Sequence, residues 1–270
     1  MKPDDYSQGD AFQAEKRTLF SSEWLPLCAE GQVEKPGDFL SATVGGWSVV
    51  AVRDRQGAVR VLRNACRHQN MQVVGAPSGN CEALRCRFHG WTYDLQGKFL
   101  SAPPPVAPKD GPSSAHDLPS LAMSNVAGLV LFTLGQPAAL PELGRVAKAY
   151  GGTLATDIAC NWKVCVEHLL AEHAPSPDFI WAWPLLTVRR AGPLTIVEQV
   201  VPHTFLRTRL FTHVFGGPAA AYEQAAATIK HVCEHLQADR AAGTPAEEVG
   251  MVAAFHTRLA EAYARDAGTI

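Results

Sequence analysis

The chain has 270 residues, of which 47% are hydrophobic and 19% are charged. This length has room for one large core or two modest ones, and the composition excludes a disordered or fibrous chain. A formal net charge of −2 gives no general attraction to nucleic acid or to an anionic membrane, so neither partner is expected.

The sequence predicts a cytoplasmic protein. Its longest apolar run, at residues 126–134, is too short to cross a bilayer, and the first residues lack the apolar stretch of a signal peptide. The seven cysteines are an odd number scattered over a mid-sized chain, which is not the pattern of a secreted disulfide framework. Reduced thiols are therefore expected, and a cysteine close to a histidine is a candidate metal ligand.

The first half of the chain is predicted to be mainly β-structure. A polar helix is expected at 7–20, a hairpin turn at 54–57, and an extended surface connection at 102–112, where five prolines occur. Apolar and β-branched runs predict strands at 24–28, 47–52, 58–62 and 126–134.

The second half mixes helices and strands. A linker or short helix at 141–152 leads into a segment, 158–172, that is helical in its later half. The remaining expected elements are two strands, 194–201 and 205–215, followed by two helices, 219–242 and 246–265. The order of elements predicts an α+β protein with domains at 1–140 and 141–270.

Two short cysteine–histidine pairs carry the most specific chemistry. Cys66-Arg67-His68 and Cys86-Arg87-Phe88-His89 are separated by 17 residues. Two thiolates and two imidazoles suit a [2Fe–2S] cluster in which each loop supplies one ligand to each iron. Structural zinc sites use the same residue types, but they prefer Cys-x2–4-Cys pairs, and neither pair has that form.

The residues after the second pair narrow the class of site. Residues 89–99, HGWTYDLQGKF, resemble the stretch that follows the second ligand pair in Rieske oxygenases. In that family the glycine, here Gly90, lets the backbone approach, and the tryptophan, here Trp91, shields the cluster. The resemblance implies a Rieske [2Fe–2S] cluster bound by Cys66, His68, Cys86 and His89.

The first loop departs from the family in one respect. Respiratory Rieske proteins bridge their two loops with an extra pair of cysteines, which this chain lacks, so it resembles the oxygenase or ferredoxin branch. Cys81 is expected to be a small buried thiol. Where the family often has Arg-Gly after the first histidine, this chain has Gln69-Asn70, and the change is expected to affect hydrogen bonds to the sulfurs.

Residues 161–168, NWKVCVEH, resemble the opening of the catalytic domain in α subunits of Rieske non-heme iron oxygenases. The resemblance implies a truncated helix-grip domain, an α/β sandwich. In the family, two histidines and a carboxylate hold a mononuclear Fe(II). Here the two histidine positions fall on His173 and Asp178, and the third ligand falls near Ile229. The carboxylate that normally reaches the neighbouring subunit's Rieske histidine is replaced by Leu170.

The mononuclear iron site is therefore expected to be incomplete. Almost no chain separates Asp178 from a strand expected around Trp183 and Pro184, where the family places much of its substrate pocket. An alternative iron site, in which Glu172 or His168 joins His173 and Asp178, remains chemically possible. Solvated or mutually paired side chains would explain the same pattern.

The four cluster ligands, which would donate electrons, are present, whereas the mononuclear iron site that would accept them is incomplete. This combination predicts an electron-transfer subunit in a trimer-based hetero-oligomer. It would take electrons from an NAD(P)H-dependent reductase or ferredoxin and pass them to a catalytic subunit with an intact mononuclear iron. Eight basic against three acidic residues between 53 and 98 would steer an acidic redox partner, although ordinary strand faces give similar counts. Two alternatives stay open: a complete compact Rieske monooxygenase or dioxygenase with an atypical iron site, and a Rieske ferredoxin-like carrier.

Overall fold

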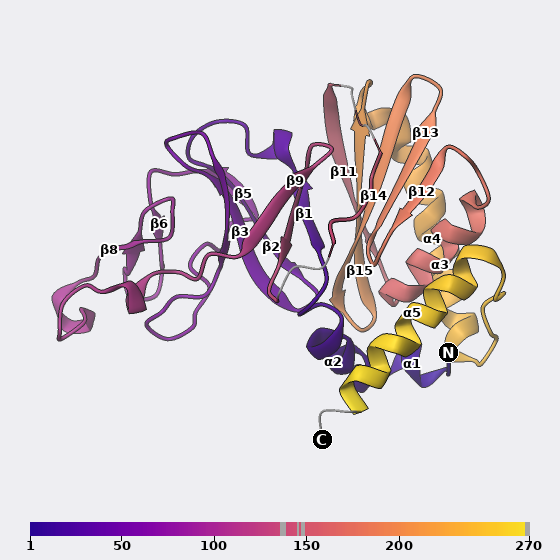
Figure 1. Cartoon of the computed structure of the whole chain (residues 1–270), viewed down its shortest axis with the longest axis horizontal. Coiled ribbons are helices and arrows are strands. Elements are labelled where there is room, and N and C mark those ends of the chain that lie inside the picture. Colours follow the sequence, from indigo (N-terminus) through magenta and orange to yellow (C-terminus); the bar gives the residue numbers. More distant parts are fainter. Residues whose placement is uncertain (136–138, 145, 147–148, 268–270) are drawn as a thin grey trace. The chain divides into compact units, whose positions relative to one another are not determined.

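The computed structural model describes residues 1–135, 139–144, 146 and 149–267 (Figure 1). The chain divides into two compact units. The first-half unit covers Leu27–Leu134 and contains the paired loops, and the second-half unit combines Met1–Pro26 with the chain from Gly135 onward. Within the described residues, every helix is too short or too polar to cross a membrane.

The sequence predicts a domain of residues 1–140 that includes the N-terminal helix, whereas contacts in the structure group that helix with the second half. Tyr6 Oη donates to Glu167 Oε1 (2.6 Å), and Trp162 Nε1 donates to Glu15 Oε2 (2.7 Å). All four side chains are buried, so these bonds attach the N-terminal segment firmly to the second-half unit. The expected helix is present as two helices, α1 (Asp4–Ser7) and α2 (Gly9–Thr18).

The first-half unit consists of small antiparallel sheets. Four strands pair in the order β4-β3-β2-β5, three in the order β6-β7-β8, and three in the order β1-β10-β9. The strands are β1 (Leu25–Ala29), β2 (Asp38–Val44), β3 (Trp47–Arg53), β4 (Val59–Arg63), β5 (Ser78–Asn80), β6 (Leu84–Arg85), β7 (Thr92–Tyr93), β8 (Phe99–Ser101), β9 (Ala122–Val126) and β10 (Leu129–Thr133).

The predicted hairpin turn at 54–57 is confirmed. Asp54 N–H donates to Ala58 O (2.8 Å), and the Asp54 carboxylate accepts from the backbone N–H groups of Gln56 and Ala58. Gly57 has φ +85°, a left-handed conformation that glycine adopts without strain. The turn joins β3 to β4, the two strands expected at 47–52 and 58–62.

The second-half unit is a five-stranded antiparallel sheet in the order β11-β15-β14-β13-β12, with helices packed on it (Figure 1). Helix α3 contacts β14 and β15, and α4 contacts β11. The strands are β11 (Tyr150–Ile158), β12 (Phe179–Ala182), β13 (Leu186–Ala191), β14 (Leu194–Thr204) and β15 (Arg207–Phe215), and the helices are α3 (Trp162–His173), α4 (Glu223–Ala241) and α5 (Gly250–Ala267).

The elements expected in this half are present, with two corrections. Trp183 and Pro184 do not lie in a strand, because they form the turn between β12 and β13. The linker or short helix expected at 141–152 ends at β11, which begins at Tyr150. Residues 145, 147 and 148 of the expected segment lie outside the described residues. Helix α3 begins where predicted, because Asn161 caps it by accepting a hydrogen bond from Lys163 N–H (3.0 Å).

Candidate metal centre

Two loops of the first-half unit carry the four predicted cluster ligands. The first loop spans residues 66–71 and the second loop spans residues 86–91. In the first loop Cys66 N–H donates to Met71 O (2.7 Å), and Asn70 N–H donates to Cys66 O (2.7 Å). Cys66 therefore opens a closed turn of six residues, which fixes its side chain relative to the histidine that follows.

The second loop repeats these hydrogen bonds. Cys86 N–H donates to Trp91 O (2.8 Å), and Gly90 N–H donates to Cys86 O (2.9 Å). Gly90 has φ +72° and Asn70, at the same position of the first loop, has φ +60°. Asparagine is one of the few residues besides glycine that tolerates this region. The departure from the family's Arg-Gly thus keeps the backbone conformation that the turn requires.

The two thiols lie inside the unit. Cys66 and Cys86 are each 2% exposed, and Cys66 Sγ lies 3.2 Å from Tyr93 Oη. Arg67 N–H donates to the same phenol oxygen (3.1 Å), so the phenol's own proton is free to bond the sulfur. Burial raises the pKa of the Cys66 thiol and of the Tyr93 phenol. A bound metal would have to displace the thiol proton, which is the usual coupling between metal binding and ligand deprotonation.

The two histidine rings lie side by side. The ring centroids of His68 and His89 are 4.7 Å apart, and Trp91 stacks on His68 at 5.3 Å with an interplanar angle of 10°. Both histidines are half-buried. Nδ1 of His68 is buried and has no hydrogen-bond partner within the described chain, a cost of about 1–3 kcal/mol that a bond to a metal would remove. Two buried thiols and two adjacent, half-buried imidazoles fit a Rieske cluster.

A single metal ion would need a different arrangement of ligands. Within the described ranges, no three His, Cys, Asp or Glu side chains surround one position suitable for a metal ion. A binuclear cluster needs no such group, because each of its irons takes only two ligands from the protein. The paired loops are thus compatible with this finding, whereas a mononuclear iron would need three converging ligands.

The predicted mononuclear iron positions lie at the end of α3 and beyond it. His173 is the last residue of the helix, and its ring lies 5.6 Å from that of Phe179. Asp178 is exposed, while Leu170 is buried on α3. In the described residues His173 and Asp178 form no three-ligand group with Glu172 or His168.

Comparison with known proteins places the centre in a class. Residues 23–122 match the Rieske [2Fe-2S] domain. The α subunit of chlorobenzene dioxygenase from Cupriavidus sp. (strain PS12) is 31% identical over 186 residues, which are 61% of this chain and 40% of that subunit. The α subunit of benzene 1,2-dioxygenase from Pseudomonas putida is 38% identical over 103 residues, covering 38% of this chain and 23% of that subunit. The chain thus spans less than half the length of these curated relatives.

Solved structures extend the likeness over the whole fold. The quaternary ammonium Rieske monooxygenase CntA superposes with a TM-score of 0.78 at 16% identity, over 97% of this chain and 95% of that chain. Dicamba monooxygenase gives 0.68 at 17% identity, over 94% and 100%. At these identities the likeness shows the fold alone. The predicted fold, an all-β Rieske domain followed by a shortened oxygenase-like domain, is confirmed.

Residues 23–122 thus form a Rieske [2Fe–2S] domain. More narrowly, the chain is similar in sequence to the α subunits of Rieske oxygenases, and its fold resembles that of Rieske oxygenases.

The hydrogen bond from Tyr93 to Cys66 was not predicted from the sequence. Trp91, Tyr93 and Leu95 alternate along the chain and are all buried, which is typical of the inward-facing side of an extended segment. The pattern does not indicate which of these side chains contacts a sulfur. That information comes from the antiparallel pairing of β7 with β6, opposite Leu84.

We expect Tyr93→Phe to lower the reduction potential of the cluster. A hydrogen bond to a ligating sulfur stabilises the reduced, more negative state. A bond of about 0.5–1.5 kcal/mol corresponds to roughly 20–60 mV for a one-electron couple. A redox titration followed by visible circular dichroism measures the shift, and Tyr222→Phe in the second-half unit is the matched control. Equal potentials in Tyr93→Phe and wild type would contradict this role.

Proposed function

We propose that Cys66, His68, Cys86 and His89 hold a Rieske [2Fe–2S] cluster through which this chain passes single electrons to a partner oxygenase subunit. The observation that carries the proposal is the orientation of the two loops. Their thiols are buried and their two imidazoles lie side by side and half-buried, with Nδ1 of His68 buried and unpartnered in the described chain. When bound, the cluster would supply reversible one-electron chemistry at the histidine side.

Other side chains would fix and shield this centre. Trp91 stacks on His68, and its Nε1 donates to Val106 O (2.9 Å). Val106 ends a short 3-10 turn (Pro104–Val106) within the proline-rich connection, so that connection holds the indole in place. The ring of His116 lies 5.7 Å from that of Trp91. This packing shields the His68 imidazole and the buried thiols from water.

The second loop also offers a surface for a redox partner. Arg85 and Arg87 are exposed, and Phe88 between the thiolate and imidazole ligands is 52% exposed. They line an open hollow of about 560 Å³ together with Pro103. Cations around an exposed aromatic ring suit an acidic partner. We therefore propose that an NAD(P)H-dependent reductase or ferredoxin delivers electrons here.

The acceptor in this proposal is the mononuclear iron of another catalytic subunit, in a trimer-based hetero-oligomer. It is supported by the aliphatic Leu170, which is buried where the family has a carboxylate, and by the exposed position of Asp178. A second candidate is a complete compact oxygenase with its own atypical iron site. This second candidate is supported by the fold match to two monooxygenases, which extends over 95% and 100% of their chains.

Metal analysis of the anaerobically purified full chain tests the proposal. We expect two irons and two inorganic sulfides per chain, a rhombic paramagnetic signal on reduction, and no oxygenation by the chain and reductase alone. Adding the catalytic subunit should oxidise the reduced cluster and start turnover. A third iron with substrate oxidation by this chain would establish the second candidate. Reduction by the reductase without transfer to an oxygenase subunit would instead favour a ferredoxin-like carrier.

A further inference from the structure

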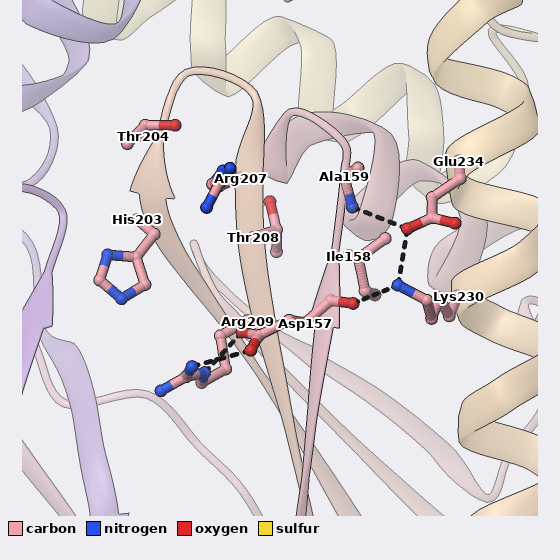
Figure 2. Close-up of a pocket in the computed structure, with 10 residues that line it drawn as sticks. All are labelled: Asp157, Ile158, Ala159, His203, Thr204, Arg207, Thr208, Arg209, Lys230 and Glu234. Carbon is pink, nitrogen blue, oxygen red and sulfur yellow. Dashed lines mark hydrogen bonds and ion pairs between the residues drawn. The ribbon is translucent and has the colours of Figure 1, made fainter. Parts of the chain in front are cut away.

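A hollow of about 420 Å³ lies in the second-half unit, among the β14–β15 hairpin, the end of β11 and α4 (Figure 2). The proposed electron transfer makes no use of it. It adjoins Ala159, just before α3, whereas the position of the family's first iron histidine, His173, is at the far end of that helix. The 12 residues of α3, from Trp162 to His173, extend about 16 Å along the helix axis. The hollow is therefore distinct from the expected iron position.

Two of the cations that line the hollow are already neutralised. Arg209 forms a bidentate pair with Asp157, with Nε–Oδ1 at 2.7 Å and Nη2–Oδ2 at 2.9 Å. Lys230 Nζ donates to Glu234 Oε1 (2.7 Å) and to the backbone oxygen of Asp157 (2.6 Å). The hydrogen bond from Arg209 lowers the pKa of Asp157, so this carboxyl is charged at neutral pH. Figure 2 shows both pairs along the walls.

The third cation, the guanidinium of Arg207, is not neutralised. Arg207 begins β15 and is exposed. It forms no hydrogen bond or ion pair with any residue that the structure describes, and no dashed line reaches it in the middle of Figure 2. His203 lines the same hollow from β14. With the other charges balanced in pairs, the Arg207 guanidinium leaves the hollow with a net positive charge of one.

The remaining walls define the chemical class of the ligand. Thr204 Oγ1 accepts from Leu206 N–H (3.3 Å), so its hydroxyl proton is free to donate into the hollow. Ile158 and Ala159 add an apolar wall. A planar guanidinium binds a carboxylate through two parallel hydrogen bonds, and the volume falls within the range of small-molecule sites. An apolar wall opposite a lone arginine suits an organic acid better than an inorganic anion.

We propose that this hollow binds a small organic carboxylate. Its carboxylate would pair with Arg207 and receive a hydrogen bond from Thr204, and its apolar part would lie against Ile158 and Ala159. The residues of this site and the paired loops belong to different units of the chain. A test of carboxylate binding is therefore independent of the electron-transfer proposal.

Calorimetric titration of the cluster-loaded full chain with benzoate tests the site. We expect saturable binding that weakens at least about tenfold in Arg207→Ala, because a charge-assisted pair is lost. Arg190→Ala, which removes an exposed arginine of β13 outside the hollow, should bind like wild type. Far-ultraviolet circular dichroism and a urea midpoint verify that both variants fold.

Three results would overturn the proposal. One is the lack of saturable benzoate binding by the wild-type chain, which decides the matter without any variant. Another is equal binding by Arg207→Ala and wild type. The third is inorganic phosphate binding more tightly than benzoate in a parallel titration, because this would identify an inorganic anion site.

Discussion

Replacing Cys86 with alanine should abolish the cluster. The purified Cys86→Ala protein should be colourless, hold close to zero of the expected two irons, and give no rhombic signal on reduction. Cys86 is 2% exposed and opens the second loop, and a vacant ligand position on one iron leaves the binuclear core incomplete. Iron and sulfide analysis with electron paramagnetic resonance measures the loss.

Cys81 provides the matched control, because it lies only five residues earlier in the chain. Its thiol is partly buried beside the core of the same unit, and burial raises its pKa. Cys81→Ala should therefore keep both irons and the signal. If Cys86→Ala retained the cluster, or if both wild type and Cys81→Ala bound stoichiometric zinc in place of iron, the ligand assignment would be wrong.

Local patterns were sufficient to predict the cluster loops. The spacing of the cysteine–histidine pairs and the residues that follow them are short-range features, and a closed turn depends mainly on its own six residues. Even the unusual Asn70 is explained locally, because asparagine adopts the left-handed conformation that Gly90 adopts in the second loop. The strands beside the hairpin turn at 54–57 could be predicted for the same reason.

Long-range contacts explain what the sequence did not reveal. The sequence does not predict strand β11, and Gly151 and Gly152 near its start weaken its strand pattern. A Cβ atom at Gly151 would lie 1.8 Å from Gly217 O, so the glycine reflects a close approach to a segment 66 residues away in the chain. The strand exists because it pairs with β15, and pairing of this kind overrides local propensity.

The N-terminal helices illustrate the same limit. Lys163 Nζ pairs with Glu15 Oε1, and both side chains are at most 1% exposed. From the sequence alone, Glu15 is one of several charged residues on a predicted polar helix, with nothing to indicate that it is buried. Only its partner, 148 positions later, shows that this charge is buried and that the helix belongs to the second-half unit.

The same helices depend on a second buried charge, and its removal should strongly destabilise the second-half unit. Glu167, 3% exposed, accepts from Tyr6 Oη (2.6 Å) and from Arg240 Nε (3.1 Å). His256 Nε2 lies 2.9 Å from the same carboxylate, and its Nδ1 lies 2.8 Å from Glu248. This one carboxylate thus connects α1, α3, α4 and α5.

We expect Glu167→Gln to lower the free energy of unfolding by about 3–5 kcal/mol, because it leaves the buried guanidinium of Arg240 without its counter-charge. The corresponding fall in melting temperature is on the order of 10 °C. Urea unfolding followed by tryptophan fluorescence measures the loss. Glu261→Gln on α5, which changes an exposed glutamate, should stay within about 0.5 kcal/mol of wild type.

The pH dependence of the free energy of unfolding provides a second test of the role of Glu167. Burial alone would lower the pKa of His256, but hydrogen bonds to Glu167 and Glu248 outweigh it and raise the pKa. A raised folded-state pKa contributes stability that is fully present below the unfolded value of about 6.5 and is lost as the pH rises through the folded value. Wild type should lose stability over that interval, and Glu167→Gln should lose less, because His256 keeps only one of its two carboxylate partners. A Glu167→Gln protein as stable as wild type, with the same pH slope, would show that Glu167 does not stabilise the four helices.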